Sequence, residues 1–253
     1  MSKEFEKLCL PAPPIQFLRS PAFMNAMFVT AGGQWLKSQL ELLRGMFPLA
    51  RLKELLLEDY AGMPIIMNSE FLTSHNSIHH LYHFARYAKS TGVEPANVES
   101  ILEWGGGYGN LAKLLFRLSE SKRTYTIIDL PLLSCVQWIY LSTVVGAERV
   151  NLVNGGGEGI TSGKINLLPL TFLEECNIHP DLFISTWALS ESSRRSQDYA
   201  VEKGWFDAKH LLLAYNVTSH DFPETSSVHK LAIDRGVITE EIKFLPGSYY
   251  AFK

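Results

Sequence analysis

The segment ILEWGGGYGN, residues 101–110, joins a short apolar run to an acid and to four glycines in five positions. Glycines let the backbone approach a bound group closely, and the free N–H groups that open a following helix can hold an anion. Such a loop is suited to a phosphate, a dinucleotide pyrophosphate or a sulfonium cofactor. A tight turn without a ligand is the alternative, although four glycines are more than such a turn needs.

The spacing of the glycines separates these ligands. The dinucleotide fingerprint G-x-G-x-x-G/A, started at Gly105, fails at its last place because residue 110 is Asn110. The G-K-[ST] ending of a Walker A loop is also absent. The residues fit acid-x-G-x-G-x-G, with Glu103, Gly105, Gly107 and Gly109. An ammonium group favours a nearby carboxylate, and a carboxylate favours backbone N–H donors, so this pattern suits the methionine part of S-adenosylmethionine.

A second acid supports a nucleotide cofactor. Asp129 ends the next apolar run, TYTIIDL (124–130). An acid at the end of the second strand can accept both ribose hydroxyls in nucleotide-binding folds. A helix cap or a loop acid is the alternative for Asp129.

Residues 103–109 and IIDLP (127–131) resemble the first two motifs of the class I S-adenosylmethionine-dependent methyltransferases. SIHHLYHFARYA, ILEWGGGYGNLA, IIDLP, INLLP and FISTWALSES, in this order over residues 75–217, also resemble the bacterial sugar O-methyltransferase family. This resemblance implies a Rossmann-like α/β fold with a seven-stranded, mostly parallel sheet, a C-terminal antiparallel hairpin and a preceding helical region. It also implies an enzyme that uses S-adenosyl-L-methionine, releases S-adenosyl-L-homocysteine and methylates a hydroxyl of a sugar or sugar-bearing small molecule.

The resemblance also assigns the cofactor site. In the family the acid of the glycine loop lies near the methionine amino group, and the aspartate of the second motif holds the ribose. We expect the cofactor to be bound by Glu103, Gly105, Gly106, Gly107, Tyr108, Gly109, Asp129, Leu130, Ser185 and Thr186. The residues that contact the adenine stay open, because Leu168 and Pro169 stand where many class I enzymes carry an acid.

Methyl transfer to a sugar hydroxyl needs a general base or a metal near neutral pH. We expect His220 and Glu191, which follow two strands, to be catalytic. His220 could instead be a surface-loop histidine, and Glu191 could bind a sugar hydroxyl or cap a helix. The expected substrate-binding residues are Trp187, Asn216, His80 and His83.

The histidines of HHLYH raise the question of a metal site. His79 and His83 are four positions apart and share a helix face, but the sequence offers no evident third ligand. We therefore predict no metal site.

The elements that must position these residues follow from periodicity. Helical patterns cover 34–47, 49–60 and 75–92, with Asn76 or Ser77 as the expected cap of the last helix and Gly92 just beyond its end. Extended runs then alternate with helical ones, which predicts a mostly parallel sheet covered on both faces. The runs flanking Pro246-Gly247-Ser248 predict the hairpin. We divide the chain into a helical region, 1–74, and a methyltransferase domain, 75–253.

The composition of the chain limits the kinds of partner that it is expected to bind. The net charge of −3 gives no basic footprint for nucleic acid or an anionic membrane. No run is long enough to span a bilayer, and the three scattered cysteines are typical of a cytoplasmic protein. The expected partner is a small-molecule acceptor, and apolar residues in the first 60 positions could serve a homo-oligomer contact, a lid or both. A methyltransferase for a non-sugar metabolite, acting on oxygen or nitrogen, and a cofactor-binding domain without turnover are the alternatives.

Overall fold

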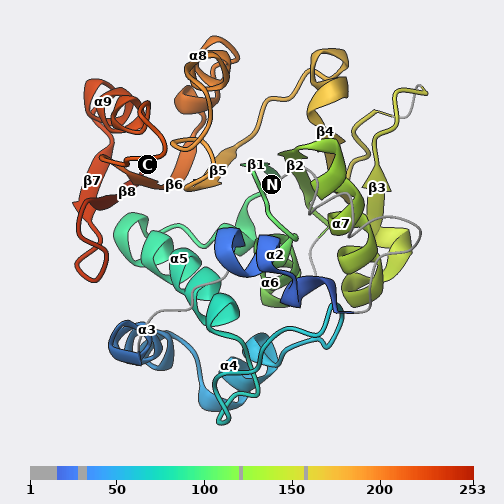
Figure 1. The fold of residues 1–253 in the computed structure, drawn as a ribbon, viewed down its shortest axis with the longest axis vertical. Coiled ribbons are helices and arrows are strands. Elements are labelled where there is room, and N and C mark those ends of the chain that lie inside the picture. The colour runs from blue at the N-terminus through green and yellow to red at the C-terminus, as the bar shows by residue number, and fades with distance from the viewer. Residues whose placement is uncertain (1–15, 28–32, 120–121, 157–158) are drawn as a thin grey trace.

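The computed structural model describes residues 16–27, 33–119, 122–156 and 159–253. Its centre is an eight-stranded sheet with the order β3-β4-β2-β1-β5-β6-β8-β7 (Figure 1). All neighbouring pairs are parallel except those of β8, which runs antiparallel to β6 and β7. The strands are β1 (Ser100–Trp104), β2 (Thr124–Asp129), β3 (Val150–Leu152), β4 (Ile165–Pro169), β5 (Leu182–Thr186), β6 (His210–Asn216), β7 (Ile238–Glu241) and β8 (Ser248–Phe252).

The strand count corrects one expectation. The Rossmann-like, mostly parallel sheet and its C-terminal antiparallel hairpin are confirmed, but the sheet has eight strands instead of seven. The additional strand is β3, which has three residues and pairs only with β4 at the sheet edge. The number seven came from the family resemblance, and β3 lies in the run RVNLVN (149–154) that precedes β4.

The helices follow the predicted alternation. They are α2 (Pro21–Met27), α3 (Gly33–Met46), α4 (Leu49–Leu56), α5 (His75–Thr91), α6 (Asn110–Leu118), α7 (Pro131–Leu141), α8 (Arg194–Glu202) and α9 (Ser226–Asp234). Short helical turns are η1 (Phe17–Arg19), η2 (Pro95–Asn97), η3 (Ser142–Gly146), η4 (Ala147–Arg149), η5 (Leu170–Glu175) and η6 (Trp205–Asp207). None of these described helices is long and apolar enough to cross a membrane.

The caps of α5 agree in part with the sequence. Gly92 ends the helix with φ of 73°, as expected. The N-cap is Ser74, whose Oγ accepts a hydrogen bond from the Ser77 N–H at 3.2 Å, and not Asn76 or Ser77. The helix therefore starts two or three residues earlier than the predicted caps allow.

The two faces of the sheet are covered by different helices (Figure 1). Strand residues such as Ile101 face a core that includes α5, α6, α7 and the N-terminal helices. Their neighbours, such as Leu102, face a second core with α8 and α9. Because Leu52 and Leu55 of α4 belong to the first core, the N-terminal helices pack on the sheet domain; the boundary at residue 74 stays a prediction.

A buried ion pair fixes the N-terminal region to the helix that follows the glycine loop. Lys113 Nζ of α6 lies 2.9 Å from Glu58 Oε1, and both side chains are buried. Ser74 and Ser77 donate to Glu58 Oε2 at 2.6 and 2.8 Å. Burial alone would raise the pKa of Glu58, but Lys113 and these hydrogen bonds hold it below its ordinary value.

Candidate functional site

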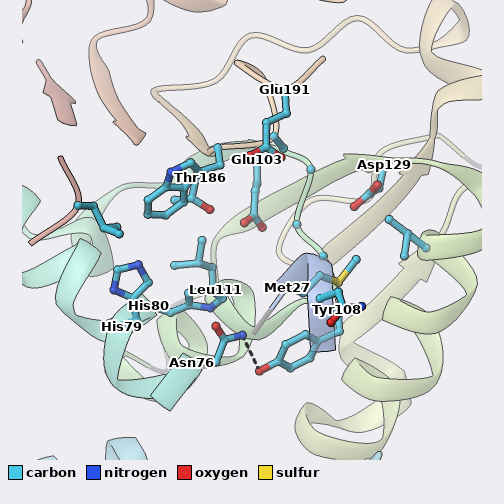
Figure 2. A pocket seen from close by; sticks show the side chains of 18 of the residues that line it. Met27, Asn76, His79, His80, Glu103, Tyr108, Leu111, Asp129, Thr186 and Glu191 are labelled. Atoms are coloured by element: carbon cyan, nitrogen blue, oxygen red, sulfur yellow. Dashed lines mark hydrogen bonds between the residues drawn. The ribbon is translucent and has the colours of Figure 1, made fainter. Parts of the chain in front are cut away.

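A cavity of about 500 Å³ lies at the carboxyl ends of β1, β2 and β5, where open α/β sheets bind their ligands. Its walls come from the N-terminal helices, α5, the glycine loop, and the segments after β2, β5 and β7 (Figure 2). The lining residues are Asn25, Met27, Trp35, Asn76, His79, His80, Glu103, Gly105, Gly106, Gly107, Tyr108, Leu111, Asp129, Leu133, Thr186, Trp187, Ala188, Glu191 and Leu245.

The glycine loop has a backbone that side chains would disturb. Gly105 has φ of 75°, and its N–H donates to the Ile128 carbonyl at 2.8 Å. A Cβ at this position would clash with the Cβ of Ala188, which follows β5. Gly107 also lies in the left-handed region, with φ of 59°. The loop can therefore pass close to the cavity while it stays bonded to β2.

Glu103 lies at the end of β1, and Figure 2 shows its carboxyl in the middle of the cavity. The side chain is 1% exposed. Tyr125 Oη donates to Oε2 at 2.9 Å, whereas Oε1 is buried and has no hydrogen-bond partner among the described residues. Burial raises the pKa of Glu103 to about 8. A cationic donor placed here would satisfy Oε1 and favour the ionised carboxylate.

Asp129 ends β2, and in Figure 2 it lies to the right of Glu103. The Leu130 N–H donates to Oδ1 and Gln137 Nε2 donates to Oδ2, both at 2.8 Å. Gln137 also donates to the Gly107 carbonyl at 2.9 Å, which ties the end of β2 to the glycine loop. Burial raises the pKa of Asp129 to about 7. Sequence reasoning missed Gln137, which only its position two turns into α7 could have suggested.

Trp187 follows β5 and lines the cavity. Its φ of 65° is unusual for a bulky residue and indicates strain of about 1–3 kcal/mol that the surrounding contacts offset. The main-chain N–H donates to the Ala214 carbonyl at 2.6 Å, and the indole N–H donates to Asn216 Oδ1 at 3.2 Å. Ser248 Oγ donates to the same oxygen at 2.8 Å. Asn216, expected to bind substrate, lies outside the lining and instead holds the Trp187 ring.

The histidines of α5 divide between the cavity and the core. His79 and His80 line the cavity, while His83 lies behind it with Nδ1 2.8 Å from Tyr250 Oη. Burial lowers the pKa of His79 to about 4 and that of His80 to about 3, so both rings are neutral at pH 7. His79 Nδ1 lies 2.9 Å from Gln39 Nε2 of α3. Of the two histidines expected to bind substrate, His80 lines the cavity and His83 does not, while His79 also lines it.

The two expected catalytic residues have different surroundings. Glu191 lines the cavity at its exposed rim, where partial burial raises the pKa of its carboxyl. His220 lies outside the lining with a fully exposed side chain, and its Nδ1 is 3.2 Å from Asp221 Oδ1. This position does not support a catalytic role for His220, because no wall of the cavity reaches it.

Of the remaining residues expected to bind the cofactor, some line the cavity and others do not. Thr186 and Tyr108 line the cavity, whereas Gly109 lies behind it as the N-cap of α6. Ser185 is buried outside the lining, where its Oγ donates to the Trp104 carbonyl at 3.2 Å. Leu130 is 55% exposed and also lies outside the lining.

The N-terminal helices supply cavity residues that sequence reasoning did not name: Asn25, Met27 and Trp35. The only sequence signal for them was the family's helical extension over the substrate. Within the described parts of the chain, no group of three or more His, Cys, Asp and Glu side chains is arranged to hold a metal ion.

Comparisons with known proteins give distant structural similarity. Neither a family model nor a curated protein matches the sequence. Magnesium protoporphyrin IX methyltransferase from Synechocystis PCC 6803, with bound S-adenosylhomocysteine, is 11% identical with a TM-score of 0.46, over 69% of this chain and 82% of that one. An O-methyltransferase family protein from Burkholderia thailandensis is 13% identical with a TM-score of 0.45, over 92% and 76%. Human N-acetylserotonin methyltransferase, in complex with S-adenosylmethionine, is 13% identical with a TM-score of 0.41, over 92% and 74%.

Proposed function

We propose that the protein is an S-adenosyl-L-methionine-dependent O-methyltransferase that acts on a small molecule. Glu103 carries this proposal. A buried carboxylate oxygen without a partner is costly, and Glu103 Oε1 is such an atom at the centre of the cavity. It lies beside a glycine loop and opposite a second acid, Asp129, which is the combination that a cationic amino acid joined to a nucleoside requires.

The residues of the cavity fit this cofactor. Glu103 Oε1 would accept a hydrogen bond from the ammonium group, and the backbone of Gly105 to Gly107 would approach the methionine part. Asp129, held by Gln137, would accept the ribose hydroxyls. When bound, S-adenosylmethionine supplies an electrophilic methyl group on its sulfonium.

Glu191 is the residue that we propose as the general base. It is a lining carboxyl at the rim, away from Asp129 in Figure 2, and its raised pKa makes it a stronger base than an ordinary carboxylate. Its carboxylate would take the proton of the acceptor hydroxyl as the oxygen is methylated. Thr186 and Trp187, which precede it, would orient the acceptor.

For the acceptor we propose a sugar or a sugar-bearing small molecule. The support is the family resemblance of residues 75–217, together with a cavity wall that contains Trp187 and Trp35. Aromatic rings provide large, rigid contact area for the nonpolar face of a ligand, while polar groups fix its orientation.

A screen for methyl transfer tests the proposal. The protein is incubated with methyl-labelled S-adenosylmethionine and a panel of glycosides, and products are detected by mass spectrometry. We expect a labelled methyl ether whose formation falls at least tenfold in Glu191→Gln, while S-adenosylhomocysteine still binds. Cofactor binding without any labelled product would instead favour a cofactor-binding domain without turnover.

A further inference from the structure

The ionisable groups that line the cavity include acids but no cation. Among the described lining residues, three carboxyls are present, those of Glu103, Asp129 and Glu191, and no Lys or Arg is present. The two lining histidines add no positive charge, because burial keeps His79 and His80 neutral at pH 7. An anion that entered this cavity would find no cationic side chain on the described walls.

Two basic side chains on the helices that follow the glycine loop and β5 are paired with acids elsewhere. Lys113 is fully buried and paired with Glu58 at 2.9 Å. Arg194 Nε, after β5, lies 2.8 Å from Asp198 Oδ1 on the surface of α8. Neither side chain lines the cavity.

One wall of the cavity is aromatic. The ring of His79 lies 5.5 Å from that of Trp187 and 6.5 Å from that of Trp35, measured between ring centroids. Leu245, from the segment between β7 and β8, also lines the cavity. The indole N–H of Trp187 donates to Asn216, which orients this ring before any ligand binds.

We propose that the acceptor carries no negative charge and lies with a nonpolar face against Trp187, Trp35 and His79, while the Glu191 carboxylate at the rim disfavours anionic molecules of the same shape. This inference rests on the proposed function, since it assigns the acceptor to the part of the cavity that the cofactor leaves. It excludes phosphorylated, nucleotide-linked and carboxylate-bearing acceptors.

The size of the exclusion follows from Coulomb's law. One negative charge about 8 Å from one carboxylate, at an effective dielectric constant of about 20, binds roughly 30-fold more weakly than a neutral group. Salt screening over one Debye length, about 8 Å at physiological ionic strength, reduces this difference to about fourfold. This estimate counts only the Glu191 carboxylate, because bound S-adenosylhomocysteine pairs its ammonium group with Glu103 and its ribose with Asp129.

The test compares two probes that differ by one carboxylate. Phenyl β-D-glucoside and phenyl β-D-glucuronide are titrated into protein saturated with S-adenosylhomocysteine, and their dissociation constants are measured by saturation-transfer NMR. We expect the glucoside to bind at least threefold more tightly. Equal or tighter binding of the glucuronide, or binding of neither probe, would overturn the inference.

Three variants locate the effect. Glu191→Gln is expected to narrow the preference for the glucoside by at least threefold, because it removes the rim carboxylate. Glu202→Gln, an exposed carboxyl on α8 outside the lining, is the matched control and should leave the preference unchanged. Trp187→Leu should weaken the binding of both probes by the same factor. A preference that persists unchanged in Glu191→Gln would contradict the role of the rim charge.

Failure of this inference is distinguishable from failure of the proposed function. Titration of S-adenosylhomocysteine into the same protein precedes the probe experiment. If S-adenosylhomocysteine does not bind, the proposed function is wrong. If it binds and the glucuronide is preferred, the cofactor assignment stands and the acceptor class is wrong.

Discussion

Replacement of Glu103 by glutamine separates the charge of this residue from its packing. The glutamine amide has nearly the same shape, and its oxygen can still accept the Tyr125 hydrogen bond that the carboxyl accepts at 2.9 Å. What is lost is the ionised partner for the cofactor's ammonium group. Loss of a charge-assisted hydrogen bond costs about 1.5–3 kcal/mol, so we expect binding of S-adenosylhomocysteine to weaken roughly 10- to 150-fold.

The pH dependence of binding gives a second magnitude. With a pKa of about 8, roughly 1% of Glu103 is ionised at pH 6 and half at pH 8. If only the ionised form binds the ammonium group, affinity rises about 50-fold between these pH values. Binding at pH 7 then releases about 0.9 of a proton from Glu103. Glu103→Gln should remove the proton release and the pH dependence of affinity that come from Glu103. Only the pH dependence that Asp129 contributes should remain.

The same substitution should stabilise the protein without cofactor. The folded-state pKa of Glu103 is raised, so the folded protein retains a proton that the unfolded chain has lost. Stability present near pH 5 is therefore lost as pH rises toward 8, by about 1.4 kcal/mol per pH unit. Glutamine cannot ionise, so between pH 5.5 and 7.5 Glu103→Gln should avoid about 3 kcal/mol of this loss.

Calorimetry and urea unfolding measure these effects. Titrations in two buffers with different ionisation enthalpies give the released protons, and urea unfolding at pH 5.5 and 7.5 gives the stability. Glu99→Gln, an exposed carboxyl just before β1, is the matched control. If Glu103→Gln binds S-adenosylhomocysteine as tightly as the parent protein, or retains the full pH dependence, the reasoning about Glu103 is refuted.

Three further substitutions test the site and its support. Asp129→Ala should weaken the binding of S-adenosylhomocysteine, measured by calorimetry, by about 1–3 kcal/mol. Unchanged affinity would contradict the assignment of Asp129 to the ribose. Gly105→Ala, at φ of 75° with its Cβ against that of Ala188, should lower the free energy of urea unfolding by about 1–3 kcal/mol; an unchanged midpoint would contradict the crowding. Lys113→Met leaves Glu58 buried without its cation and should cost about 3–5 kcal/mol. Adding Glu58→Gln should recover most of this loss, and a double variant as unstable as the single one would show that the ion pair is not the cause.

The sequence predicted those parts of the site that depend on local spacing. The glycine loop and Asp129 each lie at a strand end, and a strand end is fixed by a short apolar run and the residues after it. The resulting cluster of Glu103, glycines and Asp129 follows because parallel strands β1 and β2 end at the same edge.

The sequence did not predict which side chains of β5 point into the cavity. Ser185 and Thr186 are neighbours, and successive side chains of a strand point to opposite faces. A strand buried on both faces gives no polar alternation that distinguishes the two. The structure turns Thr186 into the cavity and Ser185 toward Trp104 and Leu189.

Tertiary packing decided the rest. Trp35 and Met27 reach the cavity because the N-terminal helices fold back over the loop, and no local pattern specifies that contact. His220 and Asn216 come from one segment, YNVTSHD, yet Asn216 supports Trp187 while His220 faces solvent. The path of a loop after its strand depends on what it packs against, which one sequence does not reveal.

Direct titration of the cofactor tests the central claim most directly. Isothermal titration with S-adenosylmethionine, S-adenosylhomocysteine and NADH is performed on the parent protein and on Gly107→Arg, whose side chain would fill the loop beside Met27. We predict that both sulfur compounds bind the parent protein, that NADH does not, and that Gly107→Arg binds none of them. Absence of binding by both sulfur compounds, or binding of NADH in their place, would contradict the account.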